Sequence, residues 1–181
     1  IKLNLNLDGS GEGDIETGVG FLDHMLALFA RHARFDLTIR CKGDNHVDDH
    51  HSVEDVGIAL GEALKESLGE KRGITRYGSM LLPMDEALVL CAVDLSGRGG
   101  LRFTADFPSE KIGSFDTELV KEFFLALART AGFTIHVRQL DGENSHHIAE
   151  AMFKALGRAL KDSVAFDPAY LDEIPSTKGV L

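Results

Sequence analysis

The sequence is poor in three features that would each define a class of protein. It has only two cysteines, Cys41 and Cys91, and we interpret both as buried strand residues rather than as a disulfide framework or a CxxC metal site. No segment approaches the roughly 18 consecutive apolar residues of a membrane span. Basic residues are outnumbered 29 to 19 by acidic ones, and the net charge of −10 argues against nucleic-acid binding. We therefore expect a protein of a reducing compartment, the cytoplasm or, in a plant, the plastid.

What the chain contains instead is an order of elements that occurs twice. Alternation of apolar and polar residues predicts strands, and apolar residues at helical spacing predict helices. In the first half the order is strand, helix, strand, helix, over residues 1–7, 20–31, 35–41 and 50–68. The second half opens with three strands and then repeats helix, strand, helix, over residues 77–82, 86–95, 101–107, 117–129, 133–139 and 146–160.

The two halves also resemble each other residue by residue. Phe35–Arg40 aligns with Phe133–Arg138 at an offset of 98 residues, and His50–Glu54 aligns with His146–Glu150 at an offset of 96. The two offsets differ because the turn between the strand and the helix is two residues shorter in the second half. Self-similarity of this kind indicates an internal duplication.

The duplication predicts the fold class. We expect an α+β fold in which a β-sheet packed against two helices occurs twice, because a sheet with one apolar face must bury it against a second layer. The two halves form one compact subunit and a single domain over residues 1–181. The division into pseudo-repeats falls at about 1–75 and 76–181.

Each half places a His-His-x-x-Glu motif at the start of its last helix. In the first half, Glu54 follows His51 by three residues and His50 by four, so its carboxylate can lie between the two rings. Adjacent histidines diverge by about 100° around a helix axis, and they cannot easily bind one ion. We infer two metal ions, with neighbouring rings directed to different ones.

A third position completes the set of donors. The strand offset pairs His24 on the first helix with Glu122 on its counterpart. The candidate ligands for two ions are then His24, His50, His51, Glu54, Glu122, His146, His147 and Glu150. Imidazoles and carboxylates without thiolates disfavour a structural zinc site and favour Mn²⁺ or Fe²⁺, although Zn²⁺ and Co²⁺ would also bind. Asp23, Asp48 and Asp49 are the expected hydrogen-bond acceptors for ring N–H groups.

Several long motifs resemble those of the imidazoleglycerol-phosphate dehydratase family, in order along nearly the whole chain. The similar segments are 18–25, 46–55, 83–87, 93–98, 115–119, 145–151 and 175–179. The resemblance implies a hydro-lyase of histidine biosynthesis that dehydrates D-erythro-imidazole glycerol phosphate to imidazole acetol phosphate. It also implies two Mn²⁺ per active site, held by the eight residues above, and a homo-oligomer of twenty-four subunits whose active sites draw on neighbouring subunits.

The resemblance assigns roles to further residues. The positions that hold the substrate phosphate in the family match Arg76, Arg98, Ser176 and Lys178. His46 either contacts the substrate or lies in a turn, and Glu54 and Glu150 are the candidates for the proton carrier. An imidazole ring bound to two cations through its two nitrogens becomes imidazolate-like, which helps to expel the hydroxyl next to it. The resemblance further implies a glutamate from a segment that precedes Ile1.

Two other functions remain open from the sequence. A duplicated metal-binding or metal-storage protein would explain the histidines, but not Arg76, Arg98 or the segment 176–178. A different dinuclear enzyme, such as a hydrolase of phosphorylated substrates, would direct a metal-bound water at phosphorus. The alternating segments argue against an all-helical ferritin-like bundle.

Overall fold

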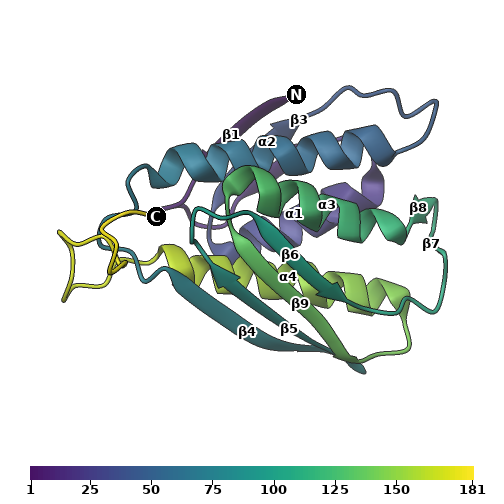
Figure 1. Cartoon of the computed structure of the whole chain (residues 1–181). Coiled ribbons are helices and arrows are strands. Elements are labelled where there is room, and N and C mark those ends of the chain that lie inside the picture. The colour runs from purple at the N-terminus through teal and green to yellow at the C-terminus, as the bar shows by residue number, and fades with distance from the viewer.

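Two β-sheets enclose a layer of four helices in the computed structural model, which describes residues 1–181 (Figure 1). The first sheet has the strand order β1–β3–β2 and packs against α1 and α2. The bounds of these elements are β1 Lys2–Asn6, β2 Gly13–Glu16, α1 Gly20–Ala33, β3 Asp36–Arg40 and α2 His50–Leu68. The fold is therefore α+β, as the repeated order of elements predicted.

The second sheet has the order β4–β5–β9–β6 and packs against α3 and α4. Its elements are β4 Tyr77–Met84, β5 Ala87–Asp94, β6 Gly100–Thr104, α3 Glu118–Ala131, β9 Thr134–Asp141 and α4 Ser145–Val164. A small hairpin precedes α3, formed by β7 Lys111–Ile112 and β8 Phe115–Asp116. No helix is both long enough and apolar enough to cross a membrane.

The two halves share one topology. In the first sheet β3 is antiparallel to β1 and parallel to β2, and in the second sheet β9 is antiparallel to β5 and parallel to β6. Each half thus contains a sheet packed against two helices, and β4 is an additional edge strand of the second half. This arrangement confirms the duplicated unit, while its boundary near residue 75 stays a prediction.

Strand burial follows the alternation of the sequence. In β5 every second residue is buried, Cys91 among them, and the pKa of its thiol is raised to about 12 by burial. Cys41 is half-buried just after β3, and both cysteines are free. The sequence did not predict β2, because Gly13–Glu16 contains a single apolar residue and pairs with β3 mainly through its backbone.

Glycines bring the helices close together in pairs. A Cβ atom at Gly157 of α4 would lie 2.7 Å from the carbonyl oxygen of Phe29 in α1. At the matching position of the other half, a Cβ atom at Gly61 of α2 would lie 3.0 Å from the carbonyl oxygen of Leu127 in α3. Both helix pairs run parallel, so the N-termini of all four helices lie at the same end of the molecule (Figure 1). That end carries all eight candidate metal ligands.

Candidate active site

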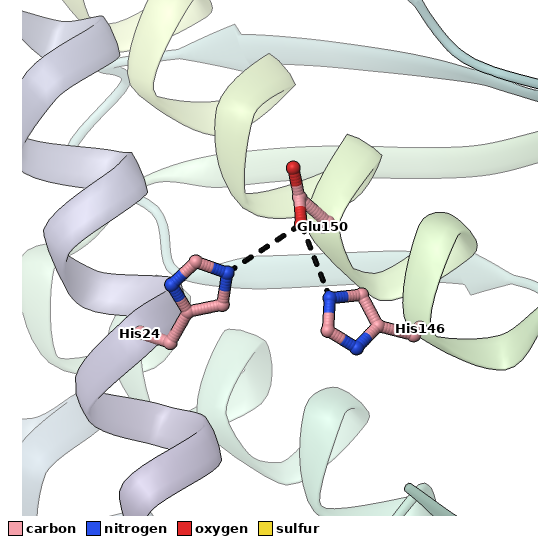
Figure 2. Close-up of side chains that lie close together, drawn as sticks. All are labelled: His24, His146 and Glu150. Carbon is pink, nitrogen blue, oxygen red and sulfur yellow. Dashed lines mark hydrogen bonds and ion pairs between the residues drawn. The ribbon is translucent and has the colours of Figure 1, made fainter.

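Three of the eight candidate ligands lie together, a group that we call the triad: His24, His146 and Glu150. Their donor atoms are all within 4.8 Å of one another. Glu150 Oε2 is 3.2 Å from His146 Nε2 and 3.6 Å from His24 Nε2, so both rings face one carboxylate oxygen (Figure 2). His24 comes from α1 and the other two from α4, so the triad joins the two halves.

Lys154, which belongs to none of the sequence motifs, holds the other oxygen of Glu150. Its Nζ lies 2.5 Å from Glu150 Oε1, one helical turn further along α4, and both side chains are mostly buried. Burial alone would raise the pKa of Glu150, but the hydrogen bond and charge of Lys154, together with His146 and His24, outweigh it and lower the pKa. Glu150 is therefore an ionised acceptor, as a metal ligand must be.

The second histidine of each motif is oriented by a carboxylate from a turn. Nδ1 of His51 lies 2.8 Å from Asp44, and Nδ1 of His147 lies 2.7 Å from Glu86. In each pair the hydrogen bond raises the pKa of the histidine and lowers that of its partner, to about 2 for Glu86. Such a bond leaves Nε2 as the available donor for a metal.

The expected partners of the ring N–H groups are therefore wrong. Asp23 accepts hydrogen bonds from Thr17, Asp49 accepts one from Asn45, and Asp48 accepts one from the backbone N–H of His50. All three carboxylates are occupied by donors of the segments that precede or begin α1 and α2, because short acidic side chains near a helix start bond to local donors.

The remaining candidate ligands are not gathered within one chain. His50 Nε2 lies 4.0 Å from Glu54 Oε2, whose side chain is 48% exposed. Glu122 is half-buried on α3 and belongs to no cluster of three donor groups, although it occupies the position that His24 has in the first half. His46 is exposed in the turn before α2.

The donor chemistry of the triad fits a divalent ion. Two ligand atoms bound to one ion at about 2.1 Å, at right angles, are about 3 Å apart. The separations of 3.2 and 3.6 Å at Glu150 are close to this value. Two imidazoles and a carboxylate suit Mn²⁺, Fe²⁺ or Zn²⁺, and three ligands leave coordination positions for further groups.

The four residues matched to phosphate binding line one pocket of roughly 510 Å³, which we call the cationic pocket. Its wall contains Arg76, Arg98, Ser176 and Lys178, with Tyr77, Pro175, Thr177, Val180 and Leu181. The segment after α4 supplies two of the four residues, and the loop between β5 and β6 supplies Arg98. Two guanidinium groups, an ammonium group and a hydroxyl are suitable donors for a phosphate.

The cationic pocket and the triad lie at opposite ends of the same helix. His146 and Glu150 are in the first two turns of α4, whereas the backbone N–H of Arg76 donates to the carbonyl of Ser163 in its last turn. The 17 residues from His146 to Ser163 span roughly 25 Å at 1.5 Å per residue. A small molecule that binds both groups in one chain is excluded.

Comparison with known proteins agrees with the motifs. Residues 17–160 match the family described as imidazoleglycerol-phosphate dehydratase. The dehydratases of Jannaschia sp. and Azorhizobium caulinodans are 61% and 60% identical over 181 residues, which cover all of this chain and 93% and 92% of those proteins.

Solved structures agree as well. The dehydratase of Staphylococcus aureus superposes with a TM-score of 0.85 at 45% identity, over 91% of this chain and 94% of that one. The dehydratase of Pyrococcus furiosus gives 0.82 at 40% identity, over 99% and 94%. The chain therefore belongs to the imidazoleglycerol-phosphate dehydratase family of carbon–oxygen lyases.

Proposed function

We propose that this lyase of histidine biosynthesis converts D-erythro-imidazole glycerol phosphate into imidazole acetol phosphate with two Mn²⁺ per active site. We propose further that it is a homo-oligomer, the twenty-four-subunit assembly of its family, in which the metal ligands of one subunit face the cationic pocket of another. The separation of the triad from the cationic pocket carries this proposal. The substrate is far shorter than roughly 25 Å, so one chain alone cannot bind both its ring and its phosphate.

The eight histidines and glutamates at the helix N-termini are the proposed metal ligands. Only three of them are gathered in one chain, so the two sets of ligands are completed between subunits. The bound ions would stabilise negative charge on the substrate imidazole while its neighbouring hydroxyl leaves. His51 and His147 present Nε2 because Asp44 and Glu86 accept the Nδ1 hydrogen bond.

The other residues bind the substrate and move its proton. In the cationic pocket, Arg98 and Lys178 bind phosphate oxygens and the Ser176 hydroxyl donates to one. A carboxylate removes the proton from the carbon next to the one that loses its hydroxyl, and the enol formed becomes the ketone. Glu150 is favoured over Glu54 for this role, because it is mostly buried and already lies between two histidines, whereas Glu54 is half exposed.

Complementation between two inactive variants tests this arrangement. Glu150→Gln removes a metal ligand, and Arg98→Ala removes a donor of the cationic pocket. After the two are unfolded and reassembled together with Mn²⁺, about a quarter of the wild-type activity is expected. A site that combines one end from each of two subunits is intact in that fraction of random pairings.

Each variant reassembled alone is the control. No recovery in the mixture, although both variants assemble and wild-type protein recovers in the same procedure, would mean that a single chain supplies the whole site. Turnover by metal-stripped wild-type protein without added Mn²⁺ would contradict the metal requirement. Hydrolysis of phosphate monoesters instead of dehydration would contradict the reaction.

We also propose that the protein works in the cytoplasm, the compartment expected from its two unpaired cysteines.

A further inference from the structure

The guanidinium group of Arg76 is held on three sides. Its Nε donates to Asp94 Oδ1 at 2.8 Å and its Nη2 to Asp94 Oδ2 at 3.3 Å, a bidentate pair. Its Nη1 donates to the carbonyl of Pro175 at 2.7 Å, and its central carbon lies 4.7 Å from the centre of the Tyr77 ring. Arg has five N–H groups, so two remain free after these three bonds.

The backbone of Arg76 is fixed as firmly as its side chain. Its φ of 72° is in the left-handed region, which a residue other than glycine adopts only when its surroundings require it. Its N–H donates to the carbonyl of Ser163 at the end of α4, and its carbonyl accepts from the N–H of Leu95 after β5. The direction of its side chain is then decided by Asp94 and Pro175.

Through Pro175 this network reaches the segment that lines the cationic pocket. Pro175 precedes Ser176, whose Oγ accepts from the N–H of Lys178 at 3.2 Å and whose carbonyl accepts from the N–H of Gly179 at 2.9 Å. Arg76 therefore connects Asp94 to the turn that carries Ser176 and Lys178. The Arg76–Asp94 pair is largely shielded, with side chains 13% and 25% exposed.

We propose that Asp94 is a positioning residue for the substrate phosphate. It orients Arg76 so that the free N–H groups face the cationic pocket, and through Arg76 it keeps the 175–179 turn at the pocket wall. The proposal rests on the function proposed for that pocket. The proposal also predicts the direction in which phosphate affinity changes when Asp94 is replaced. A negative charge beside an anion site weakens phosphate binding by charge alone. Removing that charge should strengthen binding unless Asp94 acts by positioning.

The test compares Asp94→Asn with Asp162→Asn in the full Mn²⁺-loaded protein. Asp162 is exposed on α4, close to Tyr77 and without a bond to Arg76, so this control removes the same charge nearby. For Asp94→Asn the dissociation constant of inorganic phosphate and the KM should both rise about tenfold, with kcat within about twofold. The control should bind phosphate as tightly as the wild type or more tightly. Unchanged or tighter phosphate binding by Asp94→Asn overturns the proposal.

Three further variants separate the outcomes of this test. If Asp94→Asn does not fold, Asp94→Glu keeps the charge but displaces the carboxylate, so any loss of phosphate affinity comes from position; an unchanged affinity overturns the proposal. In an Arg76→Lys background, Asp94→Asn should weaken phosphate binding little further. If the two substitutions weaken it additively, Asp94 does not act through Arg76 and the proposal is overturned. Arg98→Ala tests the pocket itself. If it leaves phosphate binding unchanged, the proposed function of the pocket fails, whatever Asp94 does.

Discussion

The helices α2 and α4 both carry a His-His-x-x-Glu motif at their start, but the side chains that surround the motif differ. In the second half, Glu150 is mostly buried, lies 3.2 Å from His146 and is held by Lys154. In the first half, Glu54 is half exposed and 4.0 Å from His50. At the position of Lys154 the first half has Ile58, which offers the carboxylate no counter-charge.

The neighbouring helix differs too. His24 approaches the motif of the second half, whereas its counterpart Glu122 makes no such contact with the motif of the first half. The motif therefore determines which donors a helix end offers, while the packing around it determines whether they are already gathered. A single chain has one group of donors already gathered, the triad, and one group at the start of α2 that is not.

The largest expected effect tests this difference directly. Glu150→Gln should lower kcat by roughly 10²–10⁴-fold, because the proposed proton carrier and metal ligand is lost. Glu54→Gln should cause a smaller loss, since Glu54 is not held within its own chain. Steady-state rates with saturating Mn²⁺, together with thermal melts to verify folding, measure both. Equal losses would show that the two helix ends contribute alike, and full activity of Glu150→Gln would exclude its catalytic role.

Lys154→Met should destabilise the metal-free protein by about 3 kcal/mol, because it leaves the mostly buried carboxylate of Glu150 without its counter-charge. Ile58→Met, the matched change in the first half, should cost less than about 1.5 kcal/mol. Urea unfolding of both variants measures the difference. In a Glu150→Gln background the cost of Lys154→Met should fall; if it does not, Lys154 stabilises the fold by packing rather than by its charge.

The sequence predicted the parts of the molecule that depend on regular patterns. Helix α2 was expected over 50–68 and has those bounds, and the repeat offset aligned the two His-His-x-x-Glu motifs at the start of α2 and α4. Periodicity shows which face of a helix or strand is buried, and self-similarity shows which segments are repeated, so both features could be predicted.

The partners of the candidate ligands could not be predicted in the same way. Asp44 and Glu86 reach the second histidines from turns that are unrelated in the repeat, and residue 85 adopts a φ of 49° just before Glu86. Turn conformation of this kind has no periodic signature. Lys154 lies within a predicted helix, but only the side chains that meet there reveal its contact with Glu150.

A smaller effect concerns the side chains that accept hydrogen bonds from the first N–H groups of α2 and α4. Asn144 accepts hydrogen bonds from the N–H groups of both His146 and His147, whereas Asp48, its counterpart, accepts only that of His50. Asn144→Ala should therefore destabilise the protein by about 1 kcal/mol and Asp48→Ala by less. Urea unfolding of the metal-free variants measures both. A larger loss for Asp48→Ala would mean that the start of α2 depends more on its one side-chain hydrogen bond than the start of α4 depends on its two.

The smallest effect is one that the two halves should share, the pH dependence of their histidine–carboxylate pairs. The pKa of Glu86 is lowered from 4.5 to about 2 by the hydrogen bond from His147, so its contribution to stability is complete above pH 4.5 and is lost as the pH falls towards 2. The pKa of His147 is raised above 6.5 by the same bond, so its contribution is complete below pH 6.5 and is lost as the pH rises through the raised value.

The difference in melting temperature between the metal-free wild type and Glu86→Gln should therefore be largest between pH 4.5 and 6.5 and shrink on either side. The difference for Asp44→Asn should shrink in the same way at alkaline pH, because the pKa of His51 is also raised by its carboxylate. Exposed ion pairs contribute little to the free energy of unfolding, so the melting temperatures of wild type and variant must be measured on matched samples across the pH range. If the difference in melting temperature did not change with pH for one of the variants, its carboxylate would stabilise the protein without its histidine. The two helix ends would then differ in this respect as well.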